Sequence, residues 1–155
     1  AKIALGIGMN VVFYDLHTGS VSLELEFFNK SNLKFDLQRS TFKEVLSVSD
    51  FITLHVPAQK KYIISDTEFK LMKPGVGVIN AARGGVIDEV ALDKHLTEGK
   101  IAFAALDTFE NEPKPEIKLL MNPNISLTPH IGAATNEAQD RIGLELAEQI
   151  IQLLS

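Results

Sequence analysis

The sequence contains no cysteine, and this absence excludes several kinds of chemistry. A chain without thiols has no disulfide framework, no thiolate zinc site and no cysteine nucleophile, which suits a reducing compartment. The four histidines show no HExxH or similar metal-binding spacing: His17, His55, His95 and His130. We therefore expect no metal centre. His95 stands between Lys94 and Glu98 in a helical pattern and is expected at the surface.

The chain also lacks the features of membrane proteins and nucleic-acid-binding proteins. No apolar run approaches the roughly 18 residues of a membrane span, and the first residues show no signal-like pattern. Lys and Arg number 15 against 20 Asp and Glu, and the basic residues are scattered, so no broad cationic face is predicted. We expect a cytoplasmic protein that binds neither nucleic acid nor membrane. Its 155 residues suffice for one domain, or for part of a larger one.

What remains alternates between strand and helix patterns. Apolar β-prone runs predict strands at 11–14, 51–57, 75–82, 101–107 and 124–130, with a weak strand at 35–37. Capping boxes and terminating glycines predict helices that begin near residues 41, 65 and 88, and a long helix over 136–154. The segments 16–34 and 108–124 are predicted as loops. Such alternation predicts an α/β fold, a Rossmann-like parallel sheet with helices on both faces.

The long C-terminal helix carries an unusually wide apolar stripe. Ile142, Leu146 and Ile150 share one helical face, and further apolar residues adjoin them: Ala147, Ile151 and Leu154. A stripe of this width is packed on both sides, either within a larger domain or against a partner chain. We expect a homo-oligomer, most simply a dimer.

Polar side chains follow the predicted strands at the points where they end: Asp15, His55, Asn80, Arg83, Asp107 and His130. In open α/β sheets, ligands bind at the carboxyl ends of the strands. Polar loops would explain one or two of these residues, but not a combination of acid, base and cation. Arg83 is always protonated, and its planar fork of donors suits a substrate carboxylate.

A proton-transfer reaction with an organic cofactor is the chemistry that this set permits. His130 is the natural acid/base, and its carboxylate partner comes from an acidic cluster that could also be a solvated loop: Glu110, Glu112 and Glu116. No side chain stands out as a nucleophile, so the hydride acceptor must come from a cofactor. Asp15 ends a predicted strand where an acid binds the adenosine ribose, and its charge would repel a 2′-phosphate. The cofactor is therefore predicted to be NAD.

Five segments of the sequence carry a family resemblance: GMNVVFYD, DFITLHVP, LMKPGVGVINAARGGVIDE, GKIAFAALDTFENEP and ISLTPHIGAAT. In this order they resemble the D-isomer-specific 2-hydroxyacid dehydrogenases, close to the D-3-phosphoglycerate dehydrogenase branch that serves serine biosynthesis. The resemblance implies reversible hydride transfer between NAD and C2 of a small 2-hydroxy or 2-oxo acid. It assigns Arg83 to the substrate, His130 to acid/base catalysis, and Glu112 to the support of His130.

The same resemblance implies a set of cofactor contacts. Asp15 corresponds to the ribose acid and Asp107 to the residue that contacts the nicotinamide amide, while the backbone at Ala81 lies near the nicotinamide. The remaining positions are His55, through its backbone, Val56 and Pro57 on the adenine side, and Gly132 in the PHIG element.

The sequence departs from the family at its beginning. A dinucleotide-binding fold starts with a strand and a GxGxxG loop, whereas Gly6 and Gly8 follow a helical pattern and Val11 takes the third position. Residues 1–155 are therefore expected to be a partial NAD-binding domain without the first strand, the glycine-rich loop or the substrate domain, and to have little activity alone. The alternative is a non-catalytic remnant, or a dinucleotide-sensing regulatory relative that acts through protein association.

Overall fold

The computed structural model describes residues 1–28 and 30–154, and the chain divides into two compact units. The first unit comprises 1–49 with 71–73, and the second comprises 50–70 with 74–155. The first contains helix α1 (Lys2–Gly6), strands β1 (Ser20–Glu26) and β2 (Asn32–Gln38), and helix α2 (Phe42–Val48). Just beyond the end of helix α1, Gly8 lies in the left-handed region at φ 84°, which glycine adopts readily after a helix.

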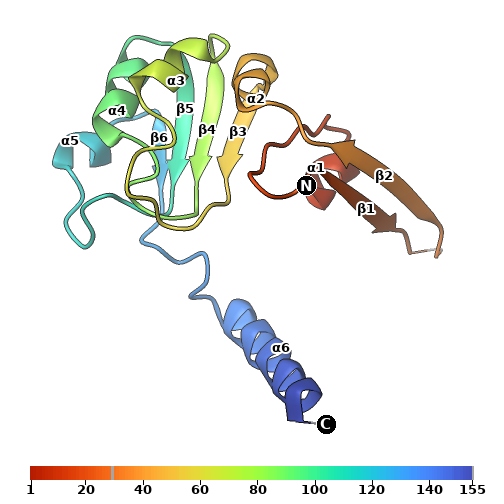
Figure 1. Ribbon diagram of the computed structural model, residues 1–155. Helices are drawn as coiled ribbons and strands as arrows, with labels where there is room; N and C mark the ends of the chain where they lie inside the picture. Colours follow the sequence, from red (N-terminus) through yellow and green to blue (C-terminus); the bar gives the residue numbers. More distant parts are fainter. Residues whose placement is uncertain (29, 155) are drawn as a thin grey trace. The chain divides into compact units, whose positions relative to one another are not determined.

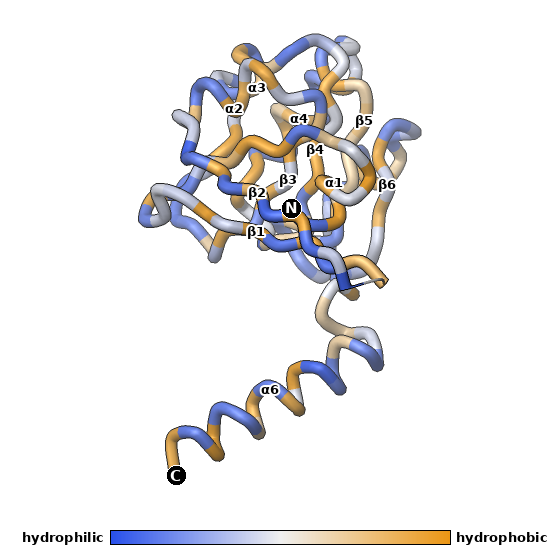
Figure 2. The backbone as a smooth tube through the Cα atoms, turned by 90° about the vertical axis from the view of Figure 1, so that its right-hand side faces the viewer, coloured by the Kyte–Doolittle hydropathy of each residue, from blue (hydrophilic) through white to orange (hydrophobic). Residues whose placement is uncertain are grey.

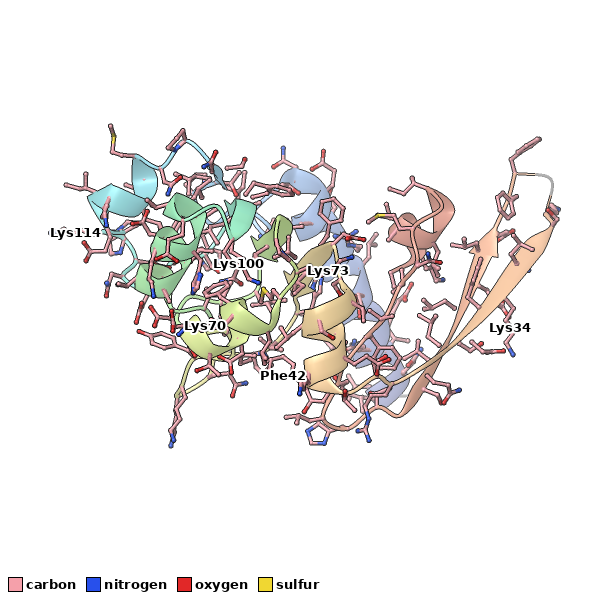
Figure 3. The ribbon with its side chains drawn as sticks, turned by 90° about the horizontal axis from the view of Figure 1, so that it is seen from above. Lys34, Phe42, Lys70, Lys73, Lys100 and Lys114 are labelled. Carbon is pink, nitrogen blue, oxygen red and sulfur yellow. The ribbon has the colours of Figure 1, made fainter. Side chains whose placement is uncertain are left out.

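The predicted loop at 16–34 is wrong, because this part of the chain enters an antiparallel hairpin formed by β1 and β2 (Figure 1). Strand β1 reads SVSLELE, with alternate residues half-buried: Val21, Leu23 and Leu25. This period of two is the pattern of a half-buried strand, and it had been masked by the overall polarity of the segment. The weak strand predicted at 35–37 is confirmed as part of β2, where Lys34 (Figure 3) lies 3.6 Å from the carboxylate of Asp36.

The predicted strand at 11–14 is also wrong. Within the described part of the first unit, only Phe13 of this run has a β partner, in an isolated parallel bridge to Arg39. A single bridge is not a ladder, so these apolar residues do not form a strand. Asp15 consequently follows a bridge residue rather than a strand.

The second unit contains the parallel sheet that the sequence predicted (Figure 1). Its strands lie in the order β3 (Phe51–Leu54), β4 (Val76–Asn80), β5 (Ile101–Leu106) and β6 (Ile125–Leu127). Helices α3 (Asp66–Leu71), α4 (Glu89–Thr97), α5 (Ile117–Leu120) and α6 (Asn136–Leu154) complete it. The short helix α5 lies inside the predicted loop 108–124, which is correct only for the rest of that segment.

The two faces of the sheet differ in exposure. Ile52, Val78 and Ala104 stand in register on one face and are buried. On the other face the ring of Phe103 lies over Gly77, where an added Cβ would fall 2.3 Å from it. Phe51 and Phe103 remain 51% and 38% exposed on that face. The core of this unit therefore lies on one side of the sheet.

The helix starts follow the predicted capping residues. The Thr41 hydroxyl accepts from the amide of Glu44, the Glu68 carboxylate accepts from the amide and hydroxyl of Ser65, and Asp88 caps α4. These bonds satisfy first-turn groups that have no partner inside a helix. Local sequence therefore placed three helix starts correctly.

Helix α6 alternates polar and apolar residues along its length (Figure 2), and Ala138 is its one buried residue in the described range. The apolar stripe is exposed, with Ile142 at 49%, Leu146 at 55% and Ile150 at 48%. None of the described helices combines the length and the hydropathy that crossing a bilayer demands.

His95 lies in the core rather than at the surface, which corrects the sequence-based expectation. It is 3% exposed, its ring packs 5.2 Å from the ring of Phe69, and its Nε2 lies 3.0 Å from the carboxylate of Asp66. Both contacts come from α3. A helical pattern read along α4 alone does not reveal them, because they depend on how the two helices pack.

Candidate active site

A carboxylate and an imidazole meet beyond the carboxyl ends of β5 and β6. The Oε2 atom of Glu112 lies 2.8 Å from Nδ1 of His130, and its Oε1 accepts the amide of Phe109 at 2.9 Å. The hydrogen bond with His130, and next the one from Phe109, hold the pKa of Glu112 below its usual value. An ionised carboxylate only accepts hydrogen bonds, so Nδ1 of His130 is the donor and Nε2 is left for proton exchange.

A cavity of about 370 Å³ adjoins this pair. Its wall includes Glu112 and His130 together with apolar side chains: Phe109, Pro113, Pro115, Leu120, Leu127 and Pro129. A mostly apolar pocket with a few convergent polar groups is the usual form of a small-molecule site. The side chain of His130 keeps 45% exposure, so its free nitrogen is accessible to a ligand.

The backbone of His130 is held in an unfavourable conformation. Its φ is 55°, in the left-handed region that costs a non-glycine residue of order 1–3 kcal/mol unless its surroundings fix it. Asp107 at the end of β5 supplies the anchor, because its carboxylate accepts from the Thr128 hydroxyl at 2.6 Å and from the amides of Ile131 and Gly132 at 2.8 Å each. The residues on both sides of His130 are thus tied to one carboxylate.

Burial opposes the ionisation of Asp107, but the three hydrogen bonds outweigh it and lower the pKa of this carboxyl group. An added Cβ on Gly132 would lie 2.9 Å from Oδ2 of Asp107, so a larger residue here would displace this carboxylate. Asp107 therefore acts in this structure as the anchor of the PHIG loop. Its predicted contact with a nicotinamide amide stays a prediction.

Arg83 lies in a turn that Asn80 organises. The buried side-chain amide of Asn80 donates from Nδ2 to the carbonyl oxygen of Arg83 at 2.9 Å. Its Oδ1 accepts from the backbone amide of Ala82 at 3.1 Å. Within residues 1–28 and 30–154, the Arg83 guanidinium donates only to the carbonyl oxygen of Ala82. Most of its five donors are consequently available to an anion.

The Arg83 turn packs directly against the turn that carries Glu112. An added Cβ on Gly84 would lie 1.8 Å from the carbonyl oxygen of Phe109, so only glycine allows this approach. Phe109 in turn donates its amide to Glu112. The turn that carries Arg83, the candidate anion-binding residue, is therefore in backbone contact with the turn that carries Glu112 of the candidate acid/base pair.

The remaining predicted cofactor residues lie at the ends of the strands, with one exception. Val56 and Pro57 follow β3, and Ala81 follows β4, with Pro57 and Ala81 exposed and Val56 half-buried. His55 places its Nε2 3.1 Å from the hydroxyl of Thr53. These positions and Gly132 share the edge that carries His130.

The exception is Asp15, which belongs to the first unit. Its Oδ1 accepts from the amides of Thr18 and His17, and these bonds, that of Thr18 first, lower its pKa. A ribose contact for Asp15 stays a prediction. No cluster of three or more potential metal ligands occurs within the described residues.

Three residues outside the predicted set of site residues shape the site: Thr128, Gly84 and Glu89. Thr128 bonds to Asp107, Gly84 permits the contact with Phe109, and buried Glu89 accepts the amide of Glu110 at 2.7 Å. The pair Gly84–Gly85 was a visible signal of close backbone approach. The other two residues gave none, because their partners lie 21 positions away.

A parallel α/β sheet with an exposed arginine and a carboxylate–imidazole pair at its carboxyl edge has the form of the α/β proteins that bind their ligands at this edge. The chain belongs to the D-isomer specific 2-hydroxyacid dehydrogenase family, whose NAD-binding domain model matches residues 1–132. The cofactor of that domain family is NAD.

The similar proteins include a hydroxypyruvate reductase of Thermotoga maritima, 43% identical over 99% of this chain and 48% of the relative. A D-3-phosphoglycerate dehydrogenase of Archaeoglobus fulgidus is 40% identical over 99% of this chain and 28% of the relative. The NAD-complexed D-isomer specific 2-hydroxyacid dehydrogenase of Lactobacillus delbrueckii ssp. bulgaricus is 28% identical with a TM-score of 0.76, covering 100% of this chain and 49% of the other. The chain thus spans about half the length of these relatives, or less.

Proposed function

We propose that the complete gene product transfers a hydride between NAD and C2 of a D-2-hydroxy acid. The observation that carries this proposal is the 2.8 Å contact between Glu112 and His130 in a chain of this family. The chemistry that NAD supplies is hydride exchange at C2. The residues described here supply proton exchange and binding of the substrate carboxylate.

Each residue has a distinct role in the proposed reaction. In the direction of reduction, Nε2 of protonated His130 gives its proton to the oxygen on C2, and in oxidation the neutral imidazole takes that proton back. Glu112 holds Nδ1 and stabilises the protonated ring. The Arg83 guanidinium binds the substrate carboxylate with the donors that the Ala82 carbonyl leaves free.

The exposed backbone at the strand ends suits a nicotinamide dinucleotide. Ala81 and Gly132 are small and exposed, so a flat ring can approach the main chain, and His55 to Pro57 line the next strand end. We include Asp15 as the contact to the adenosine ribose. Asp107 holds the loop that carries His130 through its hydrogen bonds to Thr128, Ile131 and Gly132. The 155-residue chain alone should turn over little substrate, because it has no GxGxxG sequence to hold the pyrophosphate.

The proposed substrate is a small 2-hydroxy acid similar to 3-phosphoglycerate, and the proposed setting is serine biosynthesis in the cytoplasm. This proposal is supported by the names of relatives that are about 40% identical to the chain, among them the D-3-phosphoglycerate dehydrogenase of Archaeoglobus fulgidus. A homodimer is also proposed, since the apolar side chains of α6 are exposed. This same exposed stripe favours the second candidate, a non-catalytic relative that acts through protein association.

Substitution of His130 tests the proposal. His130→Ala in the complete gene product should lower kcat for NADH-dependent reduction of a 2-oxo acid by about 10²–10⁴-fold, because the proton donor is gone. The NADH dissociation constant from calorimetric titration should stay unchanged. His17→Ala, which removes an exposed imidazole elsewhere, serves as the control. Full turnover in the His130 variant would remove this residue from the mechanism, and an inactive wild type would favour the non-catalytic candidate.

A further inference from the structure

Glu89 is a buried acid that the proposed reaction does not use. It begins α4, directly after the capping residue Asp88, and is 6% exposed. Glutamate is rarely buried without a partner, because the carboxylate loses its hydration. Burial, ahead of the neighbouring carboxylates, raises the pKa of Glu89.

One oxygen of Glu89 has a defined partner. Its Oε1 accepts the backbone amide of Glu110 at 2.7 Å, while its Oε2 is buried and has no hydrogen-bond partner among the described residues. Glu110 is the second residue of the turn 109–112, which ends in Glu112. The bond therefore joins the first residue of α4 to a turn that is far away in sequence.

The same turn orients the acid/base pair. The Phe109 amide, one residue before the Glu110 amide, donates to Oε1 of Glu112, and Oε2 of Glu112 holds His130. Fixing the amide of Glu110 thus fixes the backbone from which the Glu112 side chain extends. Three hydrogen bonds, joined by the backbone between Phe109 and Glu110, thus connect Glu89 through this turn to the imidazole.

Contacts with Tyr62 and Gly84 also hold the turn, but neither supplies a hydrogen-bond acceptor to the Glu110 amide. The hydroxyl of Tyr62 donates to the carboxylate of Glu110, which restrains a side chain. Gly84 packs against the Phe109–Glu110 peptide, where an added Cβ would lie 1.8 Å from the Phe109 carbonyl oxygen and 3.0 Å from the Glu110 nitrogen, but this contact offers no acceptor to that amide. The contribution of Glu89 is separate, since it is the acceptor for the backbone donor.

We propose, on the basis of the proposed dehydrogenase function, that Glu89 is a positioning residue that sets the orientation of Glu112 and, through it, the tautomer of His130. Its effect depends on the reach of an acceptor oxygen rather than on negative charge. Glutamine keeps both the length and an acceptor oxygen, and aspartate keeps the charge but is one methylene shorter. The two substitutions therefore separate reach from charge.

The test uses Glu89→Gln and Glu89→Asp in the complete gene product, with Glu98→Asp as the control. Glu98 is at the other end of α4, with a side chain 54% exposed. Glu89→Asp should lower kcat by about tenfold with little change in the KM of the 2-oxo acid, because misplacement of a catalytic group acts on turnover. Glu89→Gln should retain kcat within about twofold, and so should Glu98→Asp.

A second measurement does not depend on activity. The ¹⁵N spectrum of the neutral His130 ring should report the proton on Nδ1 in the wild type and in Glu89→Gln, and a mixture of tautomers in Glu89→Asp. Should the wild type reduce no 2-oxo acid, the proposed function fails, and the tautomer alone decides the role of Glu89. Should Glu89→Asp not fold, amide hydrogen exchange in the wild type decides it, because the proposal requires a protected Glu110 amide.

Three results would overturn the proposal. A normal tautomer and kcat in Glu89→Asp would show that reach is unimportant, and a defect in Glu89→Gln with none in Glu89→Asp would assign the effect to charge. Rapid exchange of the Glu110 amide in the wild type would show that the hydrogen bond does not restrain the turn.

Discussion

Asp107→Asn is the substitution that best tests the account of the His130 loop. The carboxylate has two acceptor oxygens, with the Thr128 hydroxyl and the Ile131 amide on Oδ1 and the Gly132 amide on Oδ2. Asparagine has one oxygen and an NH₂ group of similar size. Whichever way its amide is turned, at least one backbone amide then faces a donor and loses its partner.

The free energy lost at the loop follows from the charge of the acceptor and from the solvent exposure of the donor residues. A hydrogen bond to a charged group contributes about 1.5–3 kcal/mol. Ile131 is 43% exposed, so water partly replaces a lost bond and the lower end applies. We expect a loss of about 1.5 kcal/mol at the loop, which corresponds to about a tenfold loss of protection. The φ of 55° at His130 is then less well supported, and the imidazole becomes more mobile.

Amide hydrogen exchange measured by NMR is the appropriate assay, because it resolves the loop from the core. Protection at Ile131 or Gly132 should fall by about tenfold in Asp107→Asn, while the amide of Ala104 in β5 keeps its wild-type protection. Asp140→Asn, an exposed position on α6, is the matched control. The reasoning is refuted if both loop amides exchange at wild-type rates, or if protection falls equally throughout the sheet.

The pH dependence of the same anchor has a definite sign. The pKa of Asp107 is lowered in the folded chain, so its stabilising contribution is complete above the unfolded pKa of about 3.9 and disappears as the pH falls through the lower, folded value. Wild-type loop protection should therefore be constant through the neutral range and fall only in strong acid. Asp107→Asn should show no such transition.

Two further predictions concern the neighbouring contacts. Gly84→Ala should lower the free energy of unfolding by about 1–3 kcal/mol in urea, because its Cβ meets the Phe109 carbonyl oxygen, whereas Gly143→Ala on α6, where nothing lies within 4 Å, should raise it by about 0.5–1 kcal/mol; equal effects would contradict the close-contact argument. His130→Ala should raise the pKa of Glu112 toward its ordinary value, since the hydrogen bond with His130 is the largest cause of its lowering, and a ¹³C carboxyl titration measures this; an unchanged titration would show that the pair does not interact in solution.

The sequence predicted the parallel sheet and the three capped helices because both depend on local patterns. The runs at 51–57, 75–82, 101–107 and 124–130 each became one of the strands β3 to β6. Capping needs only a side chain and an amide three residues apart, so Thr41, Ser65 and Asp88 were readable directly. The hairpin of β1 and β2 was missed because the apolar residues of β1 alternate with serines and glutamates, which make the segment polar on average.

Burial of polar residues could not be read from the sequence. His95 was expected at the surface, and it is buried because α3 places Phe69 and Asp66 against it. Glu89 likewise looked like an ordinary first-turn acid of a helix, and its burial depends on the turn at Glu110. The partners in both cases are more than 20 positions away, so no local pattern records them.

The sequence by itself determined the chemical inventory of this protein: an arginine, a carboxylate and a histidine in family order, with no cysteine to offer another route. It also predicted the carboxyl edge of the sheet as the location of the candidate site, because parallel strands separated by helices bring their carboxyl ends together. The family resemblance singled out Glu112 from the acidic cluster as the partner of His130, and the structure places its Oε2 2.8 Å from Nδ1. Only the tertiary structure revealed that Asp107 anchors the loop. The physical reason is that hydrogen bonds require distances of about 3 Å and a fixed direction, which chain folding sets and residue order does not.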